Sequence, residues 1–321
     1  MQSPKIGVAL GSGSARGWAH VGVLQALEDI GIRPSVVCGS SAGAFVGAAY
    51  ATGNLEALAE WALELRTRDV IGMLDLAVGR GGMIAGTRVL DFLRDHEGEH
   101  ALIEDLECRF AAVATELKTG REIWLQQGSI LEAVRASISF PGMVAPVLHQ
   151  GRWLVDGGLV NPVPTSVCRA LGADVVIAVN LNAALVGWTR ESARSGTAAG
   201  EPVVEQTHEE PEEEEQGDPW RAFKDRFQAR FPALANHGRR REGKPPAMME
   251  VVLGSILVMQ DRITRSRMAG DPPEVLLSPQ LPSMRLLDFD EAEVAIAAGR
   301  ECVEGARELL ERAVGISAQL A

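Results

Sequence analysis

The sequence of 321 residues has few cysteines and no pattern that would join them. Cys38, Cys108, Cys168 and Cys302 show no short paired spacing, which argues against a disulfide framework and against a zinc site. We therefore expect small buried thiols in a reducing compartment, and we expect neither a metal ion nor another cofactor.

Basic residues and long apolar runs are also scarce. Lysine and arginine number 31 against 43 aspartates and glutamates, so the formal net charge is -12, which excludes a general nucleic-acid-binding protein. The first residues, MQSPKIGVALGSGS, lack the features of a signal peptide, and no run of about 18 uncharged apolar residues occurs. We expect a soluble, cytoplasmic protein whose membrane contact, if it has any, is peripheral at the inner membrane surface.

What the sequence does contain is an alternation of strand and helix patterns. Short apolar runs such as KIGVAL, PSVVC, FAAVATEL, RWLVD and ADVVIAVNL predict buried strands, with REIWL and EVLLSP as two more. Apolar residues at helical spacing predict helices between them. This alternation is typical of the α/β class, here a three-layer α/β/α fold with a mainly parallel central sheet. Four of the predicted helices span Ala42–Thr52, Leu55–Arg66, Met248–Met268 and Asp290–Ala313.

The composition changes after about Asn182. Residues 183–246 hold small residues, prolines and the run EEPEEEE, which cannot bury enough apolar surface to offset the entropy of ordering. We predict a core of residues 1–182, a disordered acidic insertion over 183–246, and helices and a strand in 247–321 that pack back on the core.

The stretch GSSAG, from Gly39 to Gly43, fits the pattern G-x-S-x-G with Ser41 at its centre. A strand precedes it and a helix follows, which is the setting of a nucleophile on a tight, strained turn. The two glycines remove Cβ atoms that would clash there, and the helix N-terminus favours negative charge. Ser41 is therefore a candidate nucleophile.

A serine nucleophile needs a base, and no histidine has the setting expected of one, a loop after a strand near the end of the sheet. His20 falls in the first helix, His96 and His100 in the charged stretch RDHEGEHA, His149 in a turn between strands, and His208 and His237 in or beside the insertion.

Asp156, in the stretch RWLVDGGLVNPVP, is a better candidate. It ends a predicted strand and precedes Gly157 and Gly158, which permit a tight turn. The carboxyl ends of strands are where open α/β sheets place functional groups. The alternative is that the carboxylate only orders its own turn through bonds to the backbone, and the local sequence leaves both open.

The glycine-rich stretch Gly11–Gly17 also joins a strand to a helix. A dinucleotide site fits poorly, because the glycine spacing is one residue longer than G-x-G-x-x-G and no acidic residue follows the second strand. The alternative is an oxyanion hole, in which turn amides around Gly13, Ser14 and Ala15 face a developing negative oxygen. Arg16 would then hold the loop or add positive potential.

The three stretches together resemble the patatin-like phospholipase family, particularly its bacterial members related to neuropathy target esterase. GSGSARG, GSSAG and DGGLVNPVP match in the family's order, over about Ile6–Leu181. The C-terminal EVLLSPQL and DFDEAE are similar to the tail of the bacterial group. Ser12 and Ser14 depart from the family pattern by interrupting its glycine cluster.

The resemblance implies a lipid acyl hydrolase of phospholipase or lysophospholipase type, with a Ser-Asp dyad and no metal. Ser41 would be the nucleophile, Asp156 the base, and Gly11–Gly17 the oxyanion loop, while Ser137–Val147 would line the acyl site. Two alternatives stay open: a general serine esterase or thioesterase acting on soluble esters, and a regulatory protein that retains the fold without activity.

A further stretch, residues 219–234, has aromatic residues at helical spacing, with arginines and lysine on its other faces. Such a helix can lie in the interface of a bilayer, and it would suit a lipid substrate. The alternative is that the aromatics dock on the protein's own surface or on a partner. The aromatic residues are Trp220, Phe223, Phe227 and Phe231.

Overall fold

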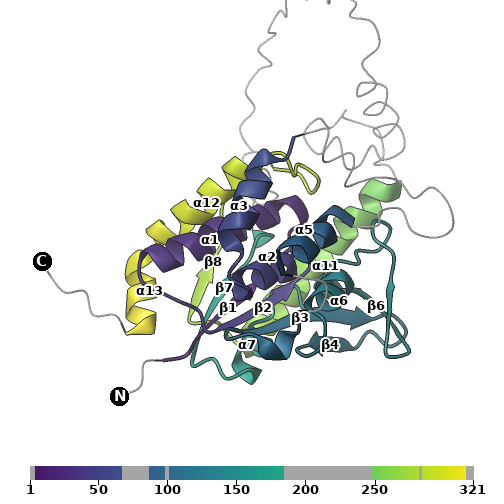
Figure 1. Cartoon of the computed structure of the whole chain (residues 1–321), viewed down its shortest axis with the longest axis horizontal. Helices are drawn as coiled ribbons and strands as arrows, with labels where there is room; N and C mark the ends of the chain where they lie inside the picture. The colour runs from purple at the N-terminus through teal and green to yellow at the C-terminus, as the bar shows by residue number, and fades with distance from the viewer. Residues whose placement is uncertain (1–3, 67–86, 98–100, 184–247, 282–283, 316–321) are drawn as a thin grey trace, which may run out of the picture.

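The computed structural model in Figure 1 describes residues 4–66, 87–97, 101–183, 248–281 and 284–315. The acidic insertion predicted over 183–246 falls outside these ranges except for its first residue, and the aromatic-basic segment 219–234 falls outside them completely. Both stay predictions, as does the division of the chain at these boundaries.

Eight strands of the described residues form one sheet in the order β5-β6-β3-β2-β1-β7-β8, with β4 paired to β3. β1 pairs in parallel with β2 and β7, β2 with β3, and β7 with β8, whereas the pairs of β3 with β4, β3 with β6, and β5 with β6 are antiparallel. The predicted mainly parallel sheet is confirmed, with an antiparallel edge. The strands are β1 (Ile6–Leu10), β2 (Val36–Ser40), β3 (Arg109–Glu116), β4 (Glu122–Leu125), β5 (Val147–His149), β6 (Arg152–Asp156), β7 (Val175–Val179) and β8 (Val275–Leu277).

Helices cover both faces of the sheet, as the α/β/α prediction requires (Figure 1). α1, α2 and α12 pack on one face, and α7 packs on the other. The helices are α1 (Trp18–Asp29), α2 (Ala42–Ala51), α3 (Leu55–Glu64), α5 (Thr87–Glu97), α6 (Ile130–Ser137), α7 (Thr165–Ala170), α11 (Met248–Gly270), α12 (Ala292–Gly305) and α13 (Arg307–Val314). Among the described residues, no helix is both long enough and apolar enough to cross a bilayer.

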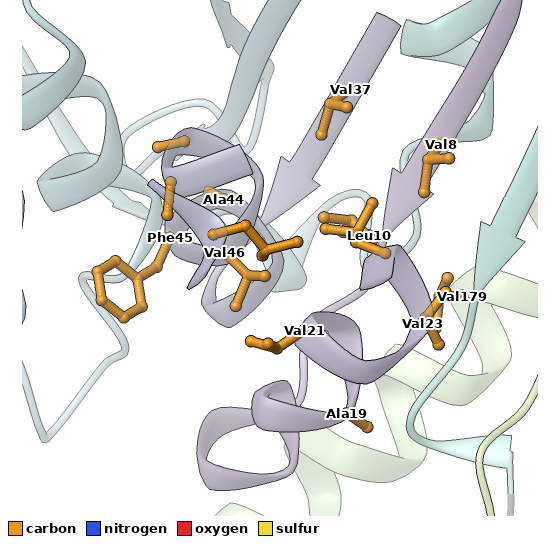
Figure 2. Close-up of a cluster of buried hydrophobic side chains, with 14 of the residues drawn as sticks. Val8, Leu10, Ala19, Val21, Val23, Val37, Ala44, Phe45, Val46 and Val179 are labelled. Carbon is orange, nitrogen blue, oxygen red and sulfur yellow. The ribbon is translucent and has the colours of Figure 1, made fainter. Parts of the chain in front are cut away.

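The central strands are apolar on both faces because successive side chains point to opposite helical layers. Val8 and Leu10 of β1 belong to the larger cluster, and Figure 2 shows them on the same side as Val21 of α1 and Val46 of α2. Ala9, between them, belongs to the smaller cluster beneath α7. The core therefore has two layers with the sheet between them.

The single C-terminal helix predicted over Asp290–Ala313 is wrong, because the chain forms two helices there. α12 ends at Gly305, and Ala306, with φ -106 and ψ 6, separates it from α13. Glycine is among the poorest helix formers, which favours a break at this point.

The helices α1 and α12 approach so closely that their facing positions have no room for side chains. A Cβ atom on Gly22 would lie 1.9 Å from the Ile296 carbonyl oxygen, and one on Gly299 would lie 2.1 Å from the Ala19 carbonyl oxygen. Since β8 also adds to the sheet beside β7, the last helices and strand are built into the same core as the first.

We expect Gly299→Val to lower the free energy of unfolding by about 2 kcal/mol or more, because the added side chain must push α12 away from α1. Urea denaturation followed by circular dichroism measures the change. Gly305→Ala is the matched control, since nothing lies within 4 Å of the Cβ position in the same helix. Equal stability of the two variants would contradict the close packing of α12 against α1.

Candidate active site

Ser41 lies on a sharp turn between β2 and α2. Its φ of 57° and ψ of -124° fall in a region that residues other than glycine rarely adopt. The flanking glycines permit this turn, because a Cβ on Gly39 would lie 2.2 Å from the Gly43 carbonyl oxygen, and one on Gly43 would lie 2.1 Å from the Leu10 carbonyl oxygen. The backbone strain presents the Ser41 side chain at the carboxyl end of the parallel strands.

Asp156 lies at the end of β6, completely buried, with each carboxylate oxygen in use. The Ser41 hydroxyl donates to Oδ2 at 2.5 Å, and the Gly158 backbone N–H donates to Oδ1 at 2.7 Å. The two roles that the sequence left open are therefore not exclusive. One oxygen orders the turn through Gly157 and Gly158, and the other contacts Ser41.

Burial raises the pKa of Asp156 to about 7, because the ionised carboxylate loses its water. The hydrogen bonds from Ser41 and Gly158 oppose that rise by stabilising the charged form. A carboxyl group that titrates near neutrality can both accept and return a proton at ordinary pH.

Three further hydrogen bonds fix the Ser41–Asp156 pair in place. The Ser41 amide donates to the Ser137 hydroxyl at 2.9 Å, the Asp156 amide donates to the Ser139 carbonyl at 2.9 Å, and the Thr115 hydroxyl donates to the Asp156 carbonyl at 2.8 Å. Sequence reasoning assigned no such role to these residues. Ser137 is the last residue of α6 and Ser139 follows that helix; both are far along the chain from Ser41, and no local pattern marks them.

The loop Gly11–Gly17 lies beside Ser41 at one wall of the same pocket. The expectation for Ala15 needs correction, since its amide donates to the Leu286 carbonyl at 3.1 Å and is already bonded. The amides of Gly13 and Ser14 have no hydrogen-bond partner among the described residues. Two of the three predicted donors are thus available to a bound oxygen.

Arg16 holds this loop from the inside. Its guanidinium is buried and donates to the Leu181 carbonyl at 3.3 Å and to the Asn182 side-chain oxygen at 3.0 Å. Burial lowers the pKa of Arg16 to about 10, and no carboxylate pairs with it within the described ranges. Asn182 in turn donates to Gln260 of α11 at 3.2 Å, so a buried polar chain links the loop to a helix that sequence reasoning did not connect with the site.

No histidine of the described residues is hydrogen-bonded to Ser41 or Asp156. His20 is buried in α1, where burial lowers its pKa to about 4, so its neutral ring donates through Nε2 to the Gly11 carbonyl at 2.7 Å. His149 is the last residue of β5 rather than a turn residue, with its Nδ1 4.0 Å from a Glu132 oxygen. His96 lies in α5, and the other three histidines fall outside the described residues.

A cavity with a volume of about 150 Å³ opens beside Ser41. Its walls are mainly apolar and include Trp18 of α1 and Phe45 of α2. Phe140 and Met143, from the segment Ser137–Val147, form part of the wall. The role of this segment as an acyl site stays a prediction. Within the described ranges, no group of three or more histidine, cysteine, aspartate or glutamate residues could hold a metal ion.

Fold and site together define a three-layer α/β protein with a Ser-Asp pair beside an apolar pocket. Residues 8–169 match the model of the family described as patatin-like phospholipase, and the chain belongs to that family. The predicted resemblance is thereby confirmed, including its relation to neuropathy target esterase, because the similar proteins carry the family name NTE.

An NTE family protein of Mycobacterium tuberculosis is 34% identical over 335 residues, covering 96% of this chain and 93% of its own. Lysophospholipase nte1 of Emericella nidulans is 32% identical over 193 residues, which cover 55% of this chain and 12% of that much longer protein. Among solved structures, VipD from Legionella pneumophila matches with a TM-score of 0.45 and 14% identity, covering 97% of this chain and 67% of that one.

We expect Asp156→Asn to stabilise the fold at pH 8 but not at pH 4. The raised pKa means that folding costs free energy once the wild-type carboxylate is ionised, and this cost grows as pH rises from about 4 to about 7. The neutral amide of asparagine avoids this cost, so the free energy of unfolding of the variant should exceed that of wild type by at least about 1 kcal/mol above pH 7. Urea unfolding at several pH values tests this, and a difference that is constant from pH 4 to pH 8 would contradict it.

Proposed function

We propose that this protein is a serine acyl hydrolase of lipid esters, of phospholipase or lysophospholipase type. Ser41 would be the nucleophile and Asp156 the general base. The observation that carries the proposal is the 2.5 Å hydrogen bond from the Ser41 hydroxyl to a buried carboxylate beside an apolar pocket. The family, and relatives named lysophospholipase, support the same class of reaction.

In the first half of the reaction, Asp156 Oδ2 accepts the hydroxyl proton while Ser41 Oγ attacks the ester carbonyl carbon. Negative charge develops on the carbonyl oxygen. The unpartnered amides of Gly13 and Ser14 are the donors that would stabilise it, and each such donor can contribute about 3 kcal/mol to the transition state. The bond to the leaving oxygen then breaks, and Asp156 returns the proton to the departing alcohol.

In the second half, a water molecule attacks the acyl-enzyme. Asp156 accepts a proton from this water, and the tetrahedral intermediate collapses with release of the fatty acid. The proton then passes to Ser41 Oγ, which restores the starting state. A single carboxyl group can serve both halves because burial places its pKa near neutrality.

The walls of the pocket favour a lipid over a small soluble ester. Trp18, Phe45, Phe140 and Met143 present apolar surface beside Ser41, and burial of an acyl chain there would stabilise the complex by about 0.8 kcal/mol for each methylene group. We place the enzyme in the cytoplasm, with peripheral contact to the membrane that holds its substrate. The aromatic-basic segment 219–234 is a predicted contributor to that contact.

Labelling with a fluorophosphonate probe, followed by mass spectrometry, tests the nucleophile. We expect the label on Ser41, and we expect Ser41→Ala to lose both the label and at least about 10³-fold in esterase rate. Ser40→Ala is the matched control, because the neighbouring Ser40 is buried and hydrogen-bonded to Ser12. A label on another serine, or a wild-type rate in Ser41→Ala, would refute the proposal.

The pH dependence of kcat/KM tests the base. Because Asp156 must be ionised to accept the proton, and its pKa is raised to about 7, the rate on a soluble ester should fall about tenfold for each pH unit below 7 and level off above it. Stopped assays from pH 5 to pH 9 measure the profile. A rate that does not change with pH over that range would argue against Asp156 as the base.

A further inference from the structure

Two β-hairpins lie side by side at the antiparallel edge of the sheet. One joins β3 to β4 and the other joins β5 to β6, and the Leu117 amide of the first donates to the Trp153 carbonyl of the second at 2.8 Å. Leu148 is the register partner of Trp153 across the β5–β6 hairpin. Since the sheet holds both hairpins, the positions of these side chains are fixed relative to one another.

Three large apolar side chains on these hairpins face solvent. Leu117 is 57% exposed, Leu148 57% and Trp153 53%. The register puts all three on one face of the sheet, because Leu148 pairs directly with Trp153, and Leu117 follows Glu116, the partner of Leu154. A tryptophan and two leucines exposed together lose the hydrophobic free energy that their burial would provide. Such an exposed apolar patch indicates a contact surface for an apolar partner.

Three cations lie near the ends of the same two hairpins, with Arg121 and Arg152 on the opposite face of the sheet from Trp153. Lys118 and Arg121 lie in the β3–β4 hairpin and Arg152 begins β6, and all three are exposed with no ion-pair partner among the described residues. Of the carboxylates in the β3–β4 hairpin, Glu122 is paired with Arg267, whereas Glu116 accepts from the neutral Thr119 hydroxyl and keeps its charge, so the three cations still outnumber it. A locally positive surface on a chain of net charge -12 points to an anionic partner.

We propose that these two hairpins form the surface by which the protein docks on an anionic lipid bilayer. The hairpin surface comprises Leu117, Leu148 and Trp153 with the cations Lys118, Arg121 and Arg152. Tryptophan and leucine enter the boundary between headgroups and acyl chains, and exposed cations pair with anionic headgroups above it. This combination of apolar tips and cations fits a lipid surface better than it fits an acidic protein, which would leave the leucines unused.

One chain segment links the wall of the pocket to the β5–β6 hairpin. Phe140, Met143 and Val144 line the pocket, and the half-exposed residues that follow run directly into β5 at Val147. A lipid that leaves the bilayer at the hairpins would thus meet apolar side chains of this segment, which also lines the pocket beside Ser41. In this respect the inference rests on the proposed function, but docking itself can be measured without turnover.

Sedimentation of the full-length protein with vesicles tests the proposal. Wild type should bind vesicles of phosphatidylcholine with phosphatidylglycerol and bind weakly to phosphatidylcholine alone. The double variant Leu148→Ser, Trp153→Ser should lose roughly tenfold or more in partition coefficient, because both side chains would no longer be buried. Replacing Lys118, Arg121 and Arg152 by glutamine should cost roughly fivefold for each charge removed.

The double variant Val258→Ser, Met259→Ser is the matched control, because these α11 side chains are 58% and 52% exposed and lie outside the hairpins. We expect it to bind vesicles as wild type does. Hydrolysis of a short soluble ester should be unchanged in every variant, which verifies that each one is folded. If turnover is absent while docking follows these expectations, the proposed function fails and the docking surface stands.

Three results would overturn the docking surface. The first is no sedimentation of wild type with phosphatidylglycerol vesicles, or equal binding with and without this lipid. The second is an equal loss of binding in the α11 control. The third is hairpin variants that keep vesicle binding but lose retention on immobilised polyglutamate, which would assign the surface to an acidic protein instead.

Discussion

The hydrogen bond between the Ser41 hydroxyl and the Asp156 carboxylate depends on features from most of the molecule. Ser41 reaches the carboxylate because a strained turn, permitted by Gly39 and Gly43, aims its side chain there. Asp156 has a pKa near neutrality because it is buried, and it is buried because β6 ends inside the protein next to β3. Water in the site would lower that pKa and weaken the pair, so the packing of the core is a condition of the chemistry.

The same site draws on residues that are far apart in sequence, and this explains why the last strand and helices belong to the same unit as the first. Arg16 of the glycine-rich loop reaches Asn182, and Asn182 reaches Gln260 of α11. A buried guanidinium without a carboxylate needs such a set of neutral acceptors, because a missing partner would leave its charge uncompensated in the interior. The part of the chain beyond residues 8–169 therefore shapes the loop that the family motif contains.

The antiparallel edge distinguishes this sheet from a purely parallel one. Two parallel strands are joined by a crossover helix that covers the sheet, whereas the two strands of a hairpin need only a short turn. The edge formed by β5 and β6 can therefore leave apolar side chains in solvent. The chain segment between α6 and β5 serves as pocket wall at one end and leads to this edge at the other. The exposure of these apolar side chains thus follows from one local departure in strand direction.

Local rules were enough to predict several features from the sequence: most strands and helices, the turn at Ser41, and the absence of a suitable histidine that led to Asp156. Each depends on neighbours a few residues away, and periodicity or a short motif reveals it. Three further features came from the folded structure: the Ala15 amide is already bonded, Ser137 holds the turn at Ser41, and Gln260 joins the site. These contacts form between residues brought together by the sheet, and the identity of a distant partner leaves no local pattern in the chain.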